Sequence, residues 1–202
     1  MKLSDIIQKI IPFGYTYLVV LGIMKESIYY YQVGINILKY SNIMDILISP
    51  IADLTSTPLL LIAVIILISL FLLIGLYISK NLHKDRIKAK VNSKKPLADI
   101  TEEEVKTYYS KVFIGMIAVN LLCFFVGIGW GEGSKVAKKI SNNELTYNYK
   151  MTFGDDQTKE IYLIGSNSSN YFYVEKGNKN ITISPVGSIK SLEITKNKRL
   201  NK

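Results

Sequence analysis

The chain has 202 residues, a net charge of +9 and 49% hydrophobic residues. Its apolar residues come in long blocks, a pattern typical of membrane proteins rather than of one soluble domain. The single histidine, His83, excludes metal sites built from two or more imidazoles, and the single cysteine excludes an intramolecular disulfide. We expect no cofactor.

Three apolar blocks predict three transmembrane helices. Residues 58–78 carry no charge, and 21 residues at about 1.5 Å each suffice to cross a hydrocarbon core of about 30 Å. The block 112–130 is also uncharged, whereas the first block, from Ile10 to about Gln32, carries Lys25 and Glu26. The expected spans are residues 10–32, 57–79 and 111–131.

The segment between the first two spans predicts an interfacial helix rather than a fourth crossing. It carries Lys39, Asp45 and Asp53, which are expensive to place in lipid. We expect this helix over about residues 43–54. The tyrosines at 29–31 and Tyr40 would form an aromatic belt above it.

A basic cluster follows the second span directly. Seven lysines and arginines fall between Lys80 and Lys95, with one aspartate against them. The positive-inside rule makes residues 80–101 a cytoplasmic loop, which places the N-terminus inside and the C-terminal part outside. Alternatively the cluster docks anionic lipid head groups or a cytosolic RNA or protein partner. The candidate docking residues are Lys84, Arg86, Lys88, Lys90, Lys94 and Lys95.

The predicted location is the bacterial inner (cytoplasmic) membrane, with several crossings. The C-terminal domain is then periplasmic or extracellular. Lys135, Lys138 and Lys139 follow the third span closely and weigh against its export.

The third helix has a clear predicted start. Thr101 and Glu104 have the spacing of a capping box, and Ile100 and Val105 have that of a hydrophobic staple. We expect this helix to run from Glu102 to about Ile140. Residues 1–140 are therefore interpreted as the membrane domain.

The period then changes from helix to strand. Five short runs rich in tyrosine, isoleucine and threonine are separated by polar turns over residues 144–195. They predict a small all-β domain, either a five-stranded antiparallel meander or an SH3-like or Sm-like barrel. Such a small core would lean on the membrane, the helices or other copies. Residues 196–202 form a basic tail.

Small residues mark two faces of the third helix. Counting back by four from Gly131 gives Gly127, Cys123 and, two steps further, Gly115. A second pair, Gly129 and Gly133, lies about 200° around the helix, so both sides can accept a close neighbour. This pattern predicts a homo-oligomer, and two opposed faces would allow a ring. Cys123 is interpreted first as a packing residue.

Polar residues inside the spans are the other candidates for function. Asn120 and Ser69 fall near the middle of the third and second spans. Asn120 either bonds a neighbouring helix or lines a pore formed by several copies. Lys25 and Glu26 either snorkel to the interface or mark a water-filled path. No motif for phosphate binding, acyl transfer or paired-carboxylate chemistry is present, so we expect no enzyme.

The block LGIMKESIYYYQVGINILKYSNIMDILISPIADLTSTP resembles small multi-span membrane accessory proteins of type VI-B CRISPR systems, which target RNA. The match lies mainly within residues 18–58, and the tail IYLIGSNSSNYFYV followed by ITISP resembles a domain found at the ends of such proteins. The resemblance implies a role in antiviral defence, an effect on a partner nuclease or on the membrane, and four or more spans. It transfers no catalytic residue.

Two functional hypotheses follow. The first is a non-enzymatic oligomeric membrane protein of antiviral defence that forms a pore or modulates a partner nuclease. The second is a membrane scaffold whose basic loop recruits a cytoplasmic protein or RNA complex without a conducting path. The expected partners are copies of itself, membrane lipids and a CRISPR nuclease or another cytoplasmic defence component. Direct binding of nucleic acid is disfavoured, because the charge pattern follows the membrane spans.

Overall fold

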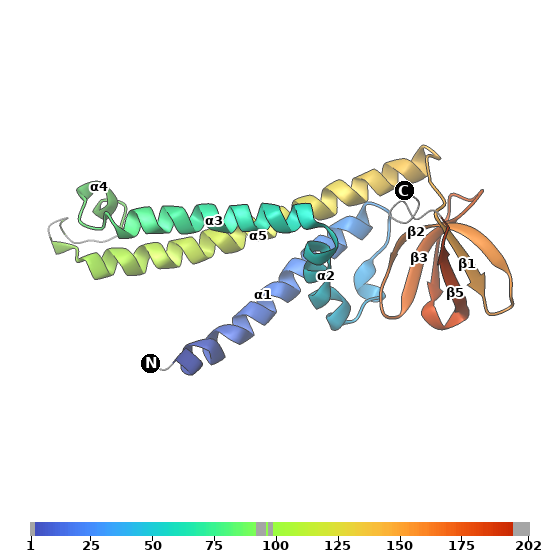
Figure 1. The fold of residues 1–202 in the computed structure, drawn as a ribbon, viewed down its shortest axis with the longest axis horizontal. Coiled ribbons are helices and arrows are strands. Elements are labelled where there is room, and N and C mark those ends of the chain that lie inside the picture. Colours follow the sequence, from blue (N-terminus) through green and yellow to red (C-terminus); the bar gives the residue numbers. More distant parts are fainter. Residues whose placement is uncertain (1–2, 92–95, 97–98, 196–202) are drawn as a thin grey trace. The chain divides into compact units, whose positions relative to one another are not determined.

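The computed structural model describes residues 3–91, 96 and 99–195. It contains five α-helices and a five-stranded antiparallel sheet within these residues (Figure 1). The chain divides into two compact units. We call residues 1–50 and 125–202 the sheet unit and residues 51–124 the hairpin unit.

The hairpin unit is built on two long helices. Helix α3 (Pro58–Ser79) begins with proline at its first position, where the missing N–H costs nothing. It is followed by the short α4 (Asp85–Lys88) and by α5 (Glu102–Ser141), whose first 23 residues, Glu102 to Phe124, belong to this unit. The rings of Phe71 on α3 and Phe113 on α5 meet edge to face, 6.5 Å apart. The two helices thus form a hairpin (Figure 1).

The predicted start of α5 is confirmed. The backbone N–H of Thr101 donates to Glu104 at 3.1 Å, and the N–H of Glu104 donates to the Thr101 hydroxyl at 3.3 Å. Ile100 and Val105 are both buried, as the hydrophobic staple requires. The end of the helix, Ser141, lies one residue beyond the expected one.

Two helices, α3 and α5, are long and apolar enough to cross a membrane. Among the described residues no other helix meets this criterion. Helix α1 (Leu3–Tyr31) contains the predicted first span, but Lys25 and Glu26 interrupt its apolar stretch. A third crossing therefore stays a prediction. The predicted interfacial segment is indeed helical, as α2 (Ile43–Ser56).

The sheet contains all five predicted strands: β1 (Tyr149–Phe153), β2 (Thr158–Ser166), β3 (Asn170–Glu175), β4 (Ile181–Pro185) and β5 (Ile189–Ile194). Their order is β4-β3-β2-β1-β5. The first four form a meander, whereas the 3-10 turn η3 (Val186–Ser188) leads β5 back to the free edge of β1.

Both faces of the sheet are apolar. One face gathers Met151, Ile161 and Tyr173, with side chains from β1, β2, β3 and β5 around them. The opposite face presents Ile164, Phe172 and Val174 to the end of α1, to the 3-10 turn η1 (Ile37–Lys39) and to the last turns of α5. The expectation that this domain leans on neighbours is met by the helices of its own chain.

Candidate functional site

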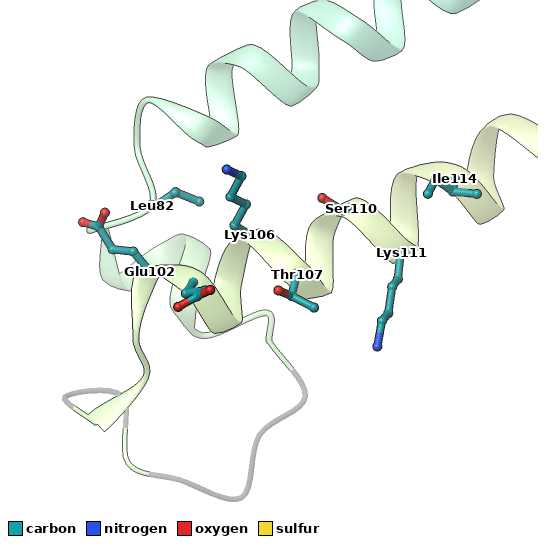
Figure 2. Close-up of a pocket in the computed structure, with 8 residues that line it drawn as sticks. Leu82, Glu102, Lys106, Thr107, Ser110, Lys111 and Ile114 are labelled. Atoms are coloured by element: carbon teal, nitrogen blue, oxygen red, sulfur yellow. The ribbon is translucent and has the colours of Figure 1, made fainter. Parts of the chain in front are cut away.

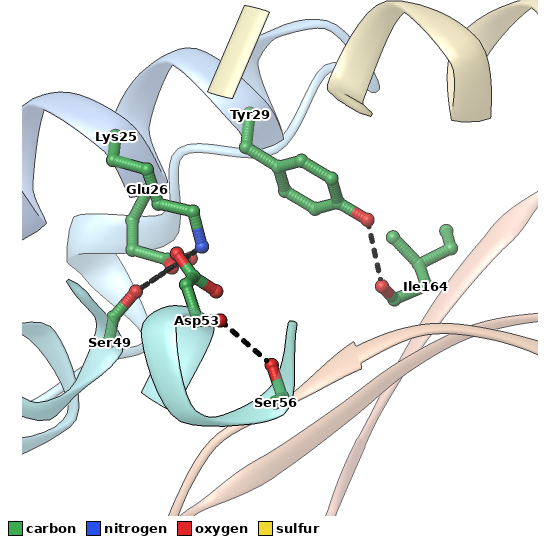
Figure 3. A network of polar contacts seen from close by, with 7 residues as sticks. All are labelled: Lys25, Glu26, Tyr29, Ser49, Asp53, Ser56 and Ile164. Carbon is green, nitrogen blue, oxygen red and sulfur yellow. Dashed lines mark hydrogen bonds and ion pairs between the residues drawn. The ribbon is translucent and has the colours of Figure 1, made fainter. Parts of the chain in front are cut away.

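The charged pair in α1 lies at a helix contact inside the sheet unit. The Lys25 ammonium is 2.8 Å from Glu26 Oε1 and 3.4 Å from the Ser49 hydroxyl of α2, and that hydroxyl donates to Glu26 (Figure 3). Lys25 is only 7% exposed. Charges that are buried and paired in this way hold elements in register, and removing one partner leaves the other unsatisfied. Within one chain, therefore, the two residues connect α1 to α2.

Glycines let the three helices approach closely around this pair. A Cβ at Gly22 of α1 would overlap the backbone of Ile46 in α2. A Cβ at Gly129 of α5 would lie 2.5 Å from the carbonyl oxygen of Lys25, and one at Gly133 would lie 2.5 Å from that of Tyr29. These are glycine contacts of the small-xxx-small kind. Gly129 and Gly133, predicted as an oligomer interface, pack against α1 of the same chain.

The other glycine face of α5 is open. No described residue has an atom within 4 Å of a Cβ placed at Gly115, Gly127 or Gly131. A four-residue step advances about 40° around an α-helix, so Gly115 ends about 160° from Gly131 and does not share its stripe. The stripe that does stay on one side runs through Asn120, Cys123, Gly127 and Gly131, of which the first three are exposed.

The two polar residues in the middle of the spans are exposed. The Asn120 side-chain amide donates to the Met116 carbonyl in the preceding turn, at 2.8 Å. This bond uses one of the two N–H donors of the amide. Ser69 of α3 is also exposed.

Two tyrosines of α1 join the helix to the sheet. The Tyr29 hydroxyl donates to the carbonyl of Ile164 at 2.9 Å (Figure 3). Ile164 is the extra residue of a bulge in β2, so no strand partner uses its position in the ladder. The Tyr30 ring packs on Phe172, and its hydroxyl occupies the space that a Cβ at Gly165 would need. Tyr29 and Tyr30, predicted to belong to an aromatic belt, thus pack against the sheet of the same chain, whereas Tyr31 is 77% exposed.

The loop between β2 and β3 binds the start of α2. The Ser168 hydroxyl accepts from the Asn42 amide at 2.9 Å and donates to Asp45 at 3.1 Å, and the Ser168 N–H donates to Asp45 at 3.1 Å. Asn42 and Asp45 also cap each other's backbone N–H groups at the first turn of α2. We call this set, Asn42, Asp45 and Ser168, the polar latch.

The basic cluster lies around α4. Lys84, Arg86 and Lys90 are exposed and Lys88 is half-buried; Lys94 and Lys95 fall outside the described residues. Beside it, a groove of about 700 Å³ follows the first turns of α5 (Figure 2). Its lining mixes both signs of charge and consists of Leu82, Glu102, Glu103, Lys106, Thr107, Ser110, Lys111 and Ile114.

Titratable groups on the sheet belong to cross-strand ion pairs. The Lys159 ammonium bonds Glu175 at 3.0 Å, and this hydrogen bond raises the pKa of Lys159. Burial raises the pKa of Tyr162. In the part of the chain that the structure describes, no three His, Cys, Asp or Glu side chains gather to hold a metal ion.

Sequence patterns did not identify Ser49, Gly22 or the polar latch. Each depends on a contact between segments distant in the chain, and serine or glycine alone carries no signal for such a contact. The capping-box spacing of Asn42 and Asp45 is the one sequence pattern that indicates the start of α2 at the latch. Compared with protein-family models, curated proteins and solved structures, the chain matches none.

Proposed function

We propose that the chain is a non-enzymatic membrane protein that assembles with copies of itself through one face of α5. We define the open face by its residues: Asn120, Cys123, Gly127 and Gly131. The observation that carries the proposal is that no described residue lies within 4 Å of a Cβ at Gly127 or Gly131, while the opposite pair, Gly129 and Gly133, already packs on α1. Small residues allow helices to approach closely in lipid, where association depends on packing and on hydrogen bonds.

Asn120 supports the choice of a second copy as the occupant. The amide can make further hydrogen bonds besides the one to Met116, and hydrocarbon offers no partner for them, which costs free energy. A second α5 against the same face would supply the Asn120 amide of the other copy. Two amides that meet across an interface satisfy each other, as buried asparagine does in coiled coils.

The native cysteine provides the first experiment. Cys123 lies on the open face and is the sole cysteine, so mild oxidation in lipid vesicles should yield a disulfide-linked dimer. The matched control is the double variant Cys123→Ser and Ile114→Cys, in which the single thiol lies at position 114. Ile114 is 70% exposed and lies about 180° around the helix from Cys123. The proposal predicts efficient cross-linking at 123 and little at 114.

Glycine substitutions provide the second arm. Gly127→Leu and Gly131→Leu should abolish the cross-link and reduce the oligomer to monomer in detergent, whereas Ile114→Leu should leave both unchanged. Equal cross-linking at 123 and 114, or an oligomer that survives both glycine substitutions, contradicts the proposal.

Conduction is part of the same proposal. A conducting ring needs a second contact face in addition to the open face, because a single self-complementary face closes at the dimer. In a ring that turns Asn120 toward its centre, Asn120→Leu should lower the conductance of a planar bilayer. The resemblance to type VI-B accessory proteins makes antiviral defence the expected setting. An oligomer without conductance would restrict the function to modulation of a partner.

A scaffold is the second candidate, favoured by the exposed cations around α4. Replacing Lys84, Arg86 and Lys90 with glutamine should release a cytoplasmic partner during co-purification and leave the oligomer intact. Replacing Lys135, Lys138 and Lys139, which lie at the other end of α5, serves as the charge-matched control. Retention of the partner by the first variant would exclude this role.

A further inference from the structure

Helix α2 is apolar on two opposite faces, and the chain covers one of them. Ile46 and Pro50 are buried, and Ile46 lies against Gly22 of α1. Met44 and Ile48 lie on the other side and are 53% and 51% exposed. At about 100° per residue, Ile48 is about 160° from Ile46, so the two sets cannot share one partner.

The exposed face continues along the helix. Ile51, which follows Ile48 by three residues, is 47% exposed, and this spacing places both on one stripe. Asp45 borders the stripe on one side and takes part in the polar latch. An apolar stripe with an acidic border and without lysine or arginine suits acyl chains and not an anionic head group.

We infer that the stripe of Met44, Ile48 and Ile51 docks on the acyl-chain region of the membrane surface, so that α2 lies in the interface. This inference rests on the proposed membrane insertion of α3. Thr57 alone separates the end of α2, Ser56, from the start of α3, Pro58. The 22 residues of α3 span about 33 Å, close to the hydrocarbon thickness of about 30 Å. The end of α2 therefore lies at the boundary of a membrane that α3 spans.

The polar latch orients the helix in that position. It bonds the first turn of α2 to the loop between β2 and β3, so the acidic border faces polar groups of the protein. Side chains on the latch side therefore stay hydrated while the stripe enters lipid.

The experiment measures depth at single labelled cysteines in proteoliposomes. In a Cys123→Ala background, Met44→Cys, Ile48→Cys and Ile66→Cys are each labelled with an environment-sensitive fluorophore. Ile66 lies in the middle of α3 and is 55% exposed. Lipids that carry a nitroxide near the head group or near the chain end serve as quenchers, and Lys179→Cys, in the turn before β4, is the water-exposed control.

The inference predicts stronger quenching at 44 and 48 by the shallow nitroxide than by the deep one, with the reverse at 66. The same pattern is expected in phosphatidylcholine alone and with phosphatidylglycerol added. Deep quenching at 66 with labels at 44 and 48 as hydrated as at 179 overturns the inference and leaves membrane insertion intact. Labels at 44 and 48 that are shielded from both lipid and water would assign the stripe to a second copy. Absence of quenching at 66 would refute insertion of α3 and, with it, this inference.

Discussion

At the scale of single residues, the alternating glycines of α5 have two different environments. Gly129 and Gly133 allow α1 to approach until backbone meets backbone, next to the buried Lys25 and Glu26. At Gly127 and Gly131, a Cβ would have no neighbour within 4 Å in the part of the chain that the structure describes. Glycine thus allows a close contact with α1 on one side of α5 and lies on an open face on the other side.

This difference predicts opposite responses to alanine. Gly129→Ala should destabilise the detergent-solubilised monomer by about 1–3 kcal/mol, because the new methyl group meets the Lys25 carbonyl and the backbone must shift. Gly127→Ala should be neutral or stabilise it by up to about 1 kcal/mol, because alanine is the better helix former and finds open space. Thermal unfolding at a protein concentration that keeps the chain monomeric measures both. Equal losses of stability in the two variants would show that the two glycines do not differ in packing.

At the scale of elements, the sheet is attached to the helices at two places with different chemistry. The Tyr29 hydroxyl donates to the bulge of β2, and the Tyr30 ring packs on Phe172 of β3. The polar latch binds the following loop to α2 through exposed hydrogen bonds. Water competes with the second set, so we expect the latch to open more readily than the tyrosine contact.

The latch predicts a graded effect of two substitutions. Ser168→Ala removes two of its hydrogen bonds and should cost about 0.5–1.5 kcal/mol. Asp45→Ala removes both bonds that Ser168 donates and the bond that the Asn42 N–H donates at the start of α2, and should cost about 1 kcal/mol more. Hydrogen exchange of the first-turn amides of α2 should rise in both variants, and more in the second. Ser191→Ala, at an exposed position of β5, is the control. If this variant speeds the exchange of the first-turn amides of α2 by the same factor, the prediction is contradicted.

At the scale of the whole molecule, the sheet unit joins the two ends of the chain. Residues 1–50 provide Tyr30, Ile35 and Ile37, which cover the face of the sheet formed by residues far along the sequence. The sheet supplies its other apolar face by itself, around Met151 and Ile161. The C-terminal sheet therefore needs the N-terminal segment to cover one of its two apolar faces.

This arrangement predicts that residues 144–195 expressed alone do not form a stable monomer. The face with Ile164, Phe172 and Val174 would be exposed, and an exposed apolar face of a sheet favours association. Sedimentation and far-ultraviolet circular dichroism test this. A variant with threonine at these three positions should be monomeric, because β-branched polar residues keep the strand preference. Cooperative unfolding of a monomeric natural fragment would contradict the prediction.

What local sequence determined is the type and extent of the elements. The uncharged runs determined α3 and about half of α5, because a long uncharged run can pair its backbone N–H and C=O groups within itself only as a helix. The capping box and staple determined the start of α5, since both act within one turn. The alternation of tyrosine, isoleucine and threonine determined the five strands.

Only the tertiary structure decided what each face contacts. The glycine period shows that two sides of α5 are narrow, but α1 happens to cover one of them, and that contact joins residues about a hundred positions apart. Tyr29 and Tyr30 look like interfacial tyrosines in sequence, yet a bulge in β2 supplies the carbonyl and the open space that they use. Lys25 is a costly charge in sequence, and the structure gives it Glu26 and Ser49. Long-range contacts of this kind leave no local signal, because they depend on how elements meet and not on how each element forms.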